Sequence, residues 1–259
     1  MRISLIQLDI AFGNPTMNYA AAENKISEAA AEAPDCLILP ELWTTGYDLT
    51  RLEDIGDPEG EITKQFISSL AKQYSINIIA GSVASRRASG VTNSMFVFNR
   101  SGALVGEYSK LHLFQLMDEH LYLQPGEAKG LFPLEGTLCA GLICYDIRFP
   151  EWVRAHTAQG AEILFISAEW PLSRLSHWRA LLISRAIENQ CYVVACNRAG
   201  SDPNNTFAGH SMIIDPWGDI LCEASEGEEI LTGDIDLHKV REIRAQIPIF
   251  TDRRPDLYD

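Results

Sequence analysis

The sequence alternates short apolar runs with longer amphipathic stretches, and this alternation constrains the fold more than any other feature. Apolar runs rich in Ile, Leu and Val are typical of buried strands, whereas apolar residues three or four positions apart predict helices. Strands are predicted at 2–10, 36–40, 76–84, 92–99, 104–110, 138–144, 162–168, 191–197, 210–221 and 228–237. Helices are predicted at 18–33, 61–75, 151–159, 174–190 and 238–247, with 174–190 the longest. The pattern indicates a layered α/β fold.

The length and the absence of an internal linker predict one domain spanning residues 1–259. The polar segment 248–259 carries the apolar pieces "IPIF" and "DLY" at its two ends, so we expect it to leave the core and pack on a partner subunit. The N-terminal stretch is interrupted by Asp9 and is predicted to be a first strand, not a signal peptide. No apolar run reaches the roughly 18 residues of a membrane span, so we expect a cytoplasmic protein.

The acidic composition restricts the partners. The 259-residue chain has 35 Asp and Glu against 21 Lys and Arg, a formal net charge of −14. This charge argues against binding to nucleic acid or to an anionic membrane surface. An anionic substrate would therefore need a local cation in its pocket.

The six cysteines form no CxxC pair, and most of them lie in strand-like runs. This placement argues against a disulfide framework or a zinc site, and it is typical of reduced, buried thiols. The cysteines are Cys36, Cys139, Cys144, Cys191, Cys196 and Cys222.

Three chemically capable residues share one placement. Glu41, Lys110 and Cys144 each come at the end of a predicted strand. In open α/β folds the ends of the strands form the edge at which ligands bind. Each residue alone also has a plain structural explanation: a surface acid, a solvated edge lysine, or a small thiol that fills the core.

The local sequence favours a chemical role for all three. Glu41 lies near Trp43 and Tyr47, whose apolar bulk would suit its carboxylate to proton transfer, and Lys110 stands in the apolar and aromatic setting "YSKLHLF". Cys144 stands at a predicted strand-to-helix turn. Backbone N–H groups at such a turn would favour the thiolate and could hold an oxyanion.

The segments "LILPELWTTGY", "YSKLHLF" and "GLICYDIRFPEW" resemble, in order and spacing, the three signature segments of the nitrilase superfamily, the carbon–nitrogen hydrolases. The resemblance extends over nearly the whole chain. It is greatest to the ω-amidase branch, through "KLHLFQLMDEHLYLQPG", "SHWRALLISRAIENQCYV", "GHSMIIDPWGDIL" and "REIRAQIPIFTDRRPDLY".

The resemblance implies a four-layer αββα sandwich with a catalytic Glu41–Lys110–Cys144 triad. Glu119, before the "PG" turn, matches a second glutamate of the family, which would position the substrate amide or tune the Lys–Glu pair. Cys144 would attack the amide, Glu41 would move protons, and Lys110 with the backbone N–H of Tyr145 would stabilise the oxyanion. Neither a metal nor an organic cofactor is implied, and a homodimer or an assembly of dimers is expected.

The residues that bind the rest of the substrate are less evident from the sequence. Arg148 or Arg174 could meet a substrate carboxylate, but Arg148 could equally form a structural ion pair with Asp146 or Glu151. Aromatic residues could be pocket walls or plain core. The candidates are Phe114, Tyr145, Arg148, Trp170, Arg174 and His177.

The resemblance implies a cysteine-dependent amide hydrolase that releases ammonia from the ω-amide of a small 2-oxo acid, 2-oxoglutaramate or 2-oxosuccinamate, through a thioester acyl-enzyme. Another amidase of the superfamily or an N-carbamoyl hydrolase would use the same chemistry. A nitrilase is disfavoured because the chain is short. A non-catalytic scaffold, or a redox sensor that uses Cys144, is the alternative of a different class, and the intact Glu–Lys–Cys set weighs against it.

Overall fold

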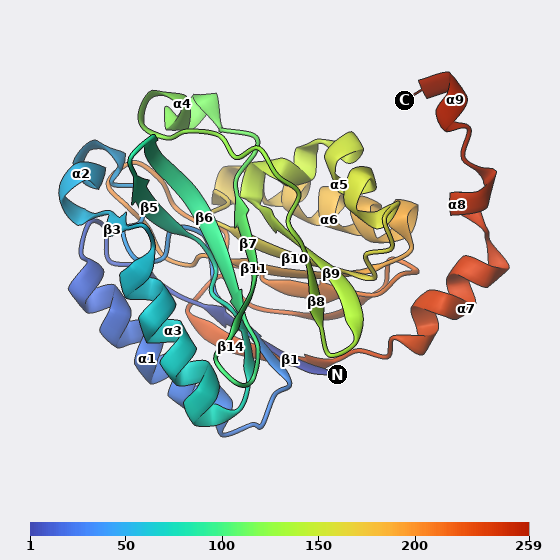
Figure 1. Ribbon diagram of the computed structural model, residues 1–259, viewed down its shortest axis with the longest axis horizontal. Helices are drawn as coiled ribbons and strands as arrows, with labels where there is room; N and C mark the ends of the chain where they lie inside the picture. Colours follow the sequence, from blue (N-terminus) through green and yellow to red (C-terminus); the bar gives the residue numbers. More distant parts are fainter. Residues whose placement is uncertain (259) are drawn as a thin grey trace.

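The computed structural model describes residues 1–258 and shows two β-sheets packed face to face, with helices on both outer faces (Figure 1). Helices α1 and α3 cover the first sheet, and α5 and α6 cover the second. The four-layer αββα sandwich expected from the resemblance is therefore confirmed.

The first sheet has the strand order β14-β1-β2-β4-β6-β5-β3, and β7 pairs with β6. Its central strands β1, β2 and β4 are parallel, whereas β14, β6 and β7 join antiparallel. The strands are β1 (Arg2–Gln7), β2 (Cys36–Ile38), β3 (Asp57–Pro58), β4 (Asn77–Ile79), β5 (Val83–Arg87), β6 (Gly90–Phe98), β7 (Leu104–Ser109) and β14 (Glu229–Asp234).

The second sheet has the order β13-β12-β11-β10-β9-β8, with a parallel centre formed by β9, β10 and β11. Its strands are β8 (Leu131–Leu134), β9 (Thr137–Ile143), β10 (Ile163–Ala168), β11 (Tyr192–Asn197), β12 (Met212–Ile214) and β13 (Ile220–Glu223).

Helix α1 of the first outer layer begins at an identifiable N-terminal signal. Asn14 caps α1 by accepting a hydrogen bond from the backbone N–H of Met17, and Pro15 occupies the first turn, where its missing N–H costs nothing. The helices are α1 (Pro15–Ala30), α2 (Leu52–Ile55), α3 (Glu61–Tyr74), α4 (Glu119–Tyr122), α5 (Pro150–Thr157), α6 (Leu175–Asn189), α7 (His238–Gln246), α8 (Ile249–Asp252) and α9 (Pro255–Tyr258).

The core has two main parts, one between the two sheets and one under α1 and α3, and alternate residues of a strand face one or the other. On β6, Met95 and Val97 face the second sheet, whereas Phe96 and Phe98 face α1 and α3. Met95 lies against Gly141 of β9, where a Cβ atom would come within 2.5 Å of the methionine sulfur. The two sheets are therefore in contact at a position where one of them lacks a side chain.

The structure differs from the prediction at several places, including strand β8, which the apolar pattern did not predict. The strand expected at 76–84 is interrupted at Gly81, which has φ +61° and approaches the Pro40 carbonyl so closely that a Cβ atom would lie 2.1 Å from its oxygen. The strand expected at 210–221 is likewise two strands, β12 and β13, joined by a turn. Helix α1, with 16 residues, is one residue longer than α6, which was expected to be the longest.

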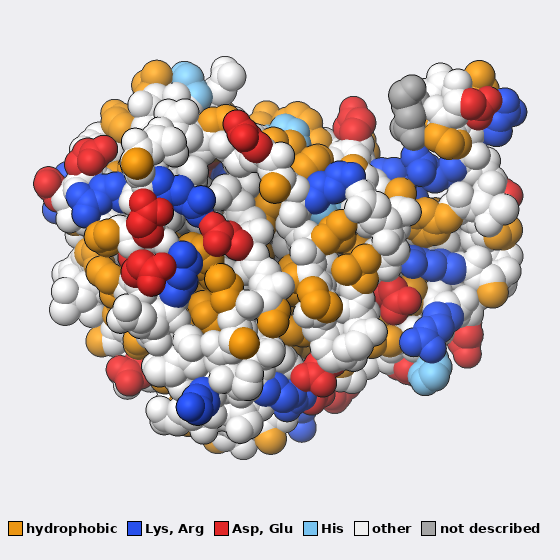
Figure 2. Space-filling view, in the orientation of Figure 1, with side chains coloured by type: hydrophobic (Ala, Val, Ile, Leu, Met, Phe, Trp, Pro, Cys, Tyr) orange, Lys and Arg blue, Asp and Glu red, His pale blue; other side chains and the backbone are white. Residues whose placement is uncertain are grey.

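The C-terminal segment α7–α9 extends away from the sandwich, and Figure 2 shows it standing clear of the body at its far end. The guanidinium groups of Arg154 in α5 and Arg244 in α7 each lie over the ring of Phe250 in α8. These contacts hold α8 against the body of the protein. Beyond α8, Leu257 and Tyr258 are 71% and 60% exposed. The expected tail 248–259 is thus seen as far as Tyr258, and Asp259 lies outside the described residues. Among the described residues, no helix combines the length and apolarity that crossing a bilayer requires.

Candidate active site

Three charged side chains from separate elements meet in the interior. The ammonium of Lys110, which follows β7, donates to Glu41 Oε1 at 2.8 Å and to Glu119 Oε1 at 2.6 Å. Glu41 follows β2, and Glu119 begins α4. All three side chains are 0% exposed, so the attraction between them is little screened by solvent.

Both oxygens of Glu41 are held in place. Oε1 also accepts a hydrogen bond from Asn93 Nδ2 at 2.8 Å, and Oε2 accepts one from the backbone N–H of Glu169 at 2.9 Å. The hydroxyl of Tyr47 lies 3.5 Å from Oε1. These contacts fix the direction of the carboxylate, which is the first requirement for proton transfer to a defined atom.

Glu119 is anchored by the loop that precedes it. Its Oε2 accepts a hydrogen bond from the backbone N–H of Phe114 at 2.8 Å, and its Oε1 accepts one from the Tyr47 hydroxyl. Burial raises the pKa of Glu119; the charge of Lys110 opposes this and that of Glu41 adds to it.

Lys110 is the charged centre of the cluster. Burial alone would lower its pKa, but the carboxylates of Glu119 and Glu41 together hold the pKa above its ordinary value. The ammonium has three N–H donors, and its hydrogen bonds within residues 1–258 use two of them. One donor is left for an oxygen atom that enters the site.

Cys144 occupies the strained turn between β9 and the short 3-10 helix η3 (Cys144–Arg148). Its φ is +43°, a left-handed value that is unusual outside glycine and is often found at functional sites. Burial raises the pKa of its thiol well above the ordinary value, the charge of Glu41 adds to this, and that of Lys110 opposes it. Burial and the two nearby carboxylates therefore act against the thiolate that the backbone N–H groups of the turn were expected to favour.

The charge of the cluster explains how such a thiol could still react. Glu41, Glu119 and Lys110 carry a net charge of −1, so loss of the thiol proton to solvent would place a second negative charge in a buried site. Transfer of that proton to Glu41 leaves the net charge unchanged. The arrangement thus couples ionisation of Cys144 to a base that is already in place.

Asp146 ties the segment after Lys110 to the turn that holds Cys144. Its carboxylate accepts hydrogen bonds from the Tyr108 hydroxyl at 2.6 Å and from the backbone N–H groups of His112 and Ile143 at 3.1 and 3.0 Å. The ring of His112 also contacts it. Asp146 is fully buried, so these contacts fix the distance between the two segments.

Cys144 lies in a narrow pocket. Five residues predicted to bind substrate line it: Phe114, Tyr145, Arg148, Trp170 and Arg174. The guanidinium of Arg148 lies over Trp170 and that of Arg174 over Phe114, at 4.7 and 5.4 Å from the ring centres. The pocket combines aromatic walls with two cations.

One predicted lining residue lies outside the pocket wall. His177 Nδ1 is 3.4 Å from Arg148 Nη2, so it contacts the arginine and not the pocket. The alternative of an ion pair between Arg148 and Asp146 is not seen, because Asp146 is occupied by Tyr108 and His112.

The model of the carbon–nitrogen hydrolase family matches residues 2–245. The chain belongs to the carbon–nitrogen hydrolase family. It is 54% identical over 256 residues to a 2-oxoglutaramate amidase from Bacillus subtilis, which covers 99% of this chain and 98% of that one. It is 34% identical to omega-amidase NIT2 from Homo sapiens, with 99% and 96% covered. A solved CN-hydrolase superfamily protein, XC1258 from Xanthomonas campestris, superposes with a TM-score of 0.92 at 32% identity, covering 98% and 97%.

The structure of this hydrolase also places residues in the pocket that the sequence analysis did not propose as binding residues: Tyr47, Met117, Glu169 and Pro171. Glu169 had an available signal, because it directly follows the apolar run 162–168 as Glu41 follows 36–40. Asn93, which orients Glu41, had none, since it lies within a strand and its partner is 52 residues away.

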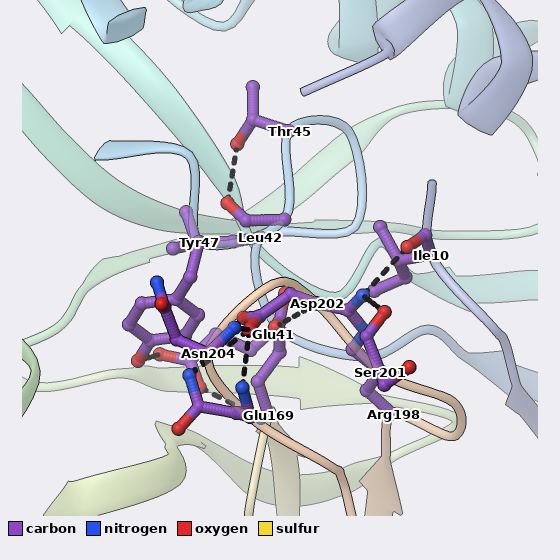
Figure 3. Close-up of polar contacts among 12 residues, drawn as sticks. Ile10, Glu41, Leu42, Thr45, Tyr47, Glu169, Arg198, Ser201, Asp202 and Asn204 are labelled. Atoms are coloured by element: carbon purple, nitrogen blue, oxygen red, sulfur yellow. Dashed lines mark hydrogen bonds and ion pairs between the residues drawn. The ribbon is translucent and has the colours of Figure 1, made fainter. Parts of the chain in front are cut away.

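Glu169 pairs with Arg198 in the interior beside the pocket. Its Oε2 accepts a hydrogen bond from Arg198 Nη1 at 2.6 Å, and Arg198 Nη2 donates to the carbonyl oxygen of Ile10 at 2.7 Å (Figure 3). Burial raises the pKa of Glu169 to about 8; the charge of Arg198 opposes this rise. Within residues 1–258, no group of three His, Cys, Asp or Glu side chains is placed to hold a metal ion.

Proposed function

We propose that this hydrolase releases ammonia from the ω-amide of a small 2-oxo acid, with 2-oxoglutaramate or 2-oxosuccinamate as its substrate. The observation that carries the proposal is the buried Glu41–Lys110–Glu119 cluster beside Cys144, at the base of a small pocket with two arginines. The 54% identity to a 2-oxoglutaramate amidase supports the choice of substrate.

In the acylation step, the Cys144 sulfur attacks the amide carbonyl carbon while Glu41 takes the thiol proton. The carbonyl oxygen becomes an oxyanion, which the remaining N–H of Lys110 and the backbone N–H of Tyr145 stabilise. Glu41 then passes its proton to the amide nitrogen, the C–N bond breaks, and ammonia leaves. The product is a thioester on Cys144.

In the deacylation step, Glu41 takes a proton from water and the resulting hydroxide attacks the thioester carbonyl. Collapse of the second tetrahedral intermediate breaks the C–S bond, and the sulfur recovers a proton from Glu41. The sum is amide plus water to carboxylic acid plus ammonia. In both steps Glu119 holds Lys110 and Tyr47 in position.

The two arginines fit the other end of the substrate. An ω-amide of a 2-oxo diacid has one carboxylate, and a protein of net charge −14 needs a local cation to bind it. Arg148 and Arg174 supply that cation at the pocket wall. A neutral amide would leave both guanidinium groups without an anionic partner.

The test is ammonia release from 2-oxoglutaramate, 2-oxosuccinamate, pentanamide and an N-carbamoyl amino acid. We expect a 2-oxo acid amide to have the highest kcat/KM. Cys144→Ala should abolish turnover, whereas Cys139→Ala, a buried cysteine on the preceding strand, should retain it. Preference for the neutral or carbamoyl compound by tenfold or more would instead indicate another amidase or an N-carbamoyl hydrolase. Modification of Cys144 without turnover of any amide would indicate a redox sensor.

The wider setting is part of the same proposal. We expect residues 1–259 to act as one domain in the cytoplasm, with only the small amide and water as reactants. The exposed apolar side chains of Leu257 and Tyr258 favour a homodimer or an assembly of dimers. The net charge of −14 disfavours a nucleic-acid partner.

A further inference from the structure

Glu169 has a feature that the mechanism above does not use. Its side chain is fully buried, and its Oε2 is paired with Arg198, but its Oε1 has no hydrogen-bond partner. Buried polar atoms are nearly always satisfied, so an orphaned carboxylate oxygen calls for an explanation. Glu169 lines the pocket that contains Cys144, which gives this oxygen a place to find a partner.

The position of Glu169 is set by elements that also set the catalytic cluster. It directly follows β10, and its backbone N–H holds Glu41 Oε2 at 2.9 Å. The backbone N–H of its neighbour Trp170 donates to Asn197 Oδ1 at 2.6 Å. Figure 3 shows Glu169 between Arg198 on one side and Glu41 and Tyr47 on the other. Glu169 is therefore held beside Glu41, at the wall of the pocket.

We propose that Glu169 is a specificity residue whose free Oε1, in the protonated acid, donates a hydrogen bond to an oxygen atom in the 2-oxo acid part of the substrate. The inference rests on the proposed function and deepens it, because it assigns a second recognition group besides the arginines. It predicts selection for substrates that carry an acceptor oxygen beyond the amide.

The chemistry of the substrate decides between the acid and the carboxylate form. A 2-oxo acid amide carries only acceptor oxygens beyond its amide group, and an ionised Glu169 is also acceptor-only, so the two would repel. The protonated acid has one O–H donor and can meet such an oxygen. Burial raises the pKa of Glu169 to about 8, which leaves the acid form dominant at neutral pH.

Charged and titratable groups from several elements face Glu169. They are Arg198 and Asp202 after β11, Glu41 and Tyr47 after β2, Cys144 and Arg148 of η3, and Arg174 of η4 (Leu172–Arg174). Arg198 favours the ionised form of Glu169, whereas Glu41 and Asp202 oppose it. The arginines of the pocket remain charged over the range in which Glu169 titrates.

The experiment compares 2-oxoglutaramate with pentanamide, which has the same number of carbon atoms but no oxygen beyond the amide. The readout is the ratio of their kcat/KM values from pH 6 to pH 10. Steps common to both substrates, including ionisation of Cys144, cancel in this ratio. In the unmodified protein the ratio should fall about tenfold between pH 7 and pH 9 as Glu169 loses its proton.

Glu169→Gln is the decisive variant. Arg198 can only donate, so the glutamine oxygen should face Arg198 and the glutamine N–H₂ should face the pocket. The variant keeps a donor that does not titrate. Its ratio at pH 7 should stay within about threefold of the unmodified protein, and the fall toward pH 9 should disappear. Glu169→Leu, which has no donor, should lower the ratio about tenfold at every pH.

Glu223→Gln is the matched control, since Glu223 also pairs with an arginine, Arg179, but lies outside the pocket. It should leave the ratio and its pH dependence unchanged. A fall that persists in Glu169→Gln, or a variant that slows both substrates equally, would overturn the inference while leaving the proposed function intact. A ratio near one in the unmodified protein at pH 6.5 would overturn the proposed function and the inference with it.

Discussion

At the scale of single residues, the site is governed by a balance of charge in a buried volume. Two carboxylates and one ammonium, all without solvent exposure, surround a thiol whose pKa is raised by burial and by Glu41. The thiol is therefore the resting form, and reaction requires a proton acceptor within the cluster. Glu41, held by Lys110, Asn93 and Glu169, is the acceptor that we propose.

This balance predicts the pH dependence of chemical modification. The thiolate fraction rises with pH, and a raised pKa moves that rise upward. The rate of alkylation of Cys144 by iodoacetamide should therefore keep increasing beyond pH 9 instead of levelling off near the ordinary thiol pKa of about 8.5. Peptide mass spectrometry measures the adduct, with Cys144→Ala as the blank. A plateau below pH 8 would refute the assignment of a resting thiol.

Lys110 is predicted to be irreplaceable by arginine. The Lys110 ammonium fits between Glu41 and Glu119 with no exposed surface, whereas a planar guanidinium is larger and cannot direct a single compact charge at the oxyanion. Lys110→Arg should lower kcat by on the order of 10²-fold or more. Exposed Lys72 on α3 offers the control Lys72→Arg, which should keep its activity. Near-normal kcat in Lys110→Arg would contradict the role.

The sequence singled out Glu41, Lys110 and Cys144 by their places at predicted strand ends and Glu119 by the family resemblance, because strand ends and motif spacing are local properties. The structure brings these four together. The raised pKa of Cys144 could not be predicted in this way, since it depends on carboxylates that other elements deliver. Glu169 has the same placement after an apolar run, but its contact with Arg198, 29 residues away, could not be predicted from local sequence.

At the scale of elements, the proposed catalytic residues lie on loops that are hydrogen-bonded to neighbouring segments. The turn at Gly81 holds the Glu41 loop, with Ser82 Oγ accepting from the backbone N–H of Leu42 at 3.0 Å and the Ser82 N–H donating to Pro40 at 3.0 Å. A continuous strand over 76–84, as the apolar pattern predicted, could not make these contacts. The strand is interrupted because of contacts with residues distant in the sequence, and the pattern of apolar residues cannot predict such contacts.

Asp146 provides a test of this fastening. Asp146→Ala removes the acceptor for Tyr108 and for the backbone N–H groups of His112 and Ile143, leaving buried donors unsatisfied. The free energy of unfolding should fall by about 3 kcal/mol, and kcat should fall as the Lys110 and Cys144 segments separate. Urea denaturation measures the first effect. Exposed Asp54 supplies the control, Asp54→Ala, and equal stability of the two variants would refute the anchoring role.

At the scale of the whole molecule, the C-terminal segment extends from the body and ends in exposed apolar side chains. Its exposed Leu257 and Tyr258 and the groove between it and α5 predict an interface with a second copy. Analytical ultracentrifugation at micromolar concentration should find a dimer or larger assembly. Deletion of 248–259 should shift the protein toward monomer, and Leu257→Glu should weaken association. A monomeric intact chain would rule out this interface.

Because the two sheets are in contact at Met95 and Gly141, a substitution there can abolish activity without unfolding the strands. Glu41 and Lys110 extend from the first sheet and Cys144 from the second, so ammonia production reports whether the sheets are docked. Gly141→Val would wedge the sheets apart, since even a Cβ atom there lies 2.5 Å from the Met95 sulfur. Turnover should then vanish while far-ultraviolet circular dichroism still records both sheets. The protein would then lose its activity while its strands remain folded.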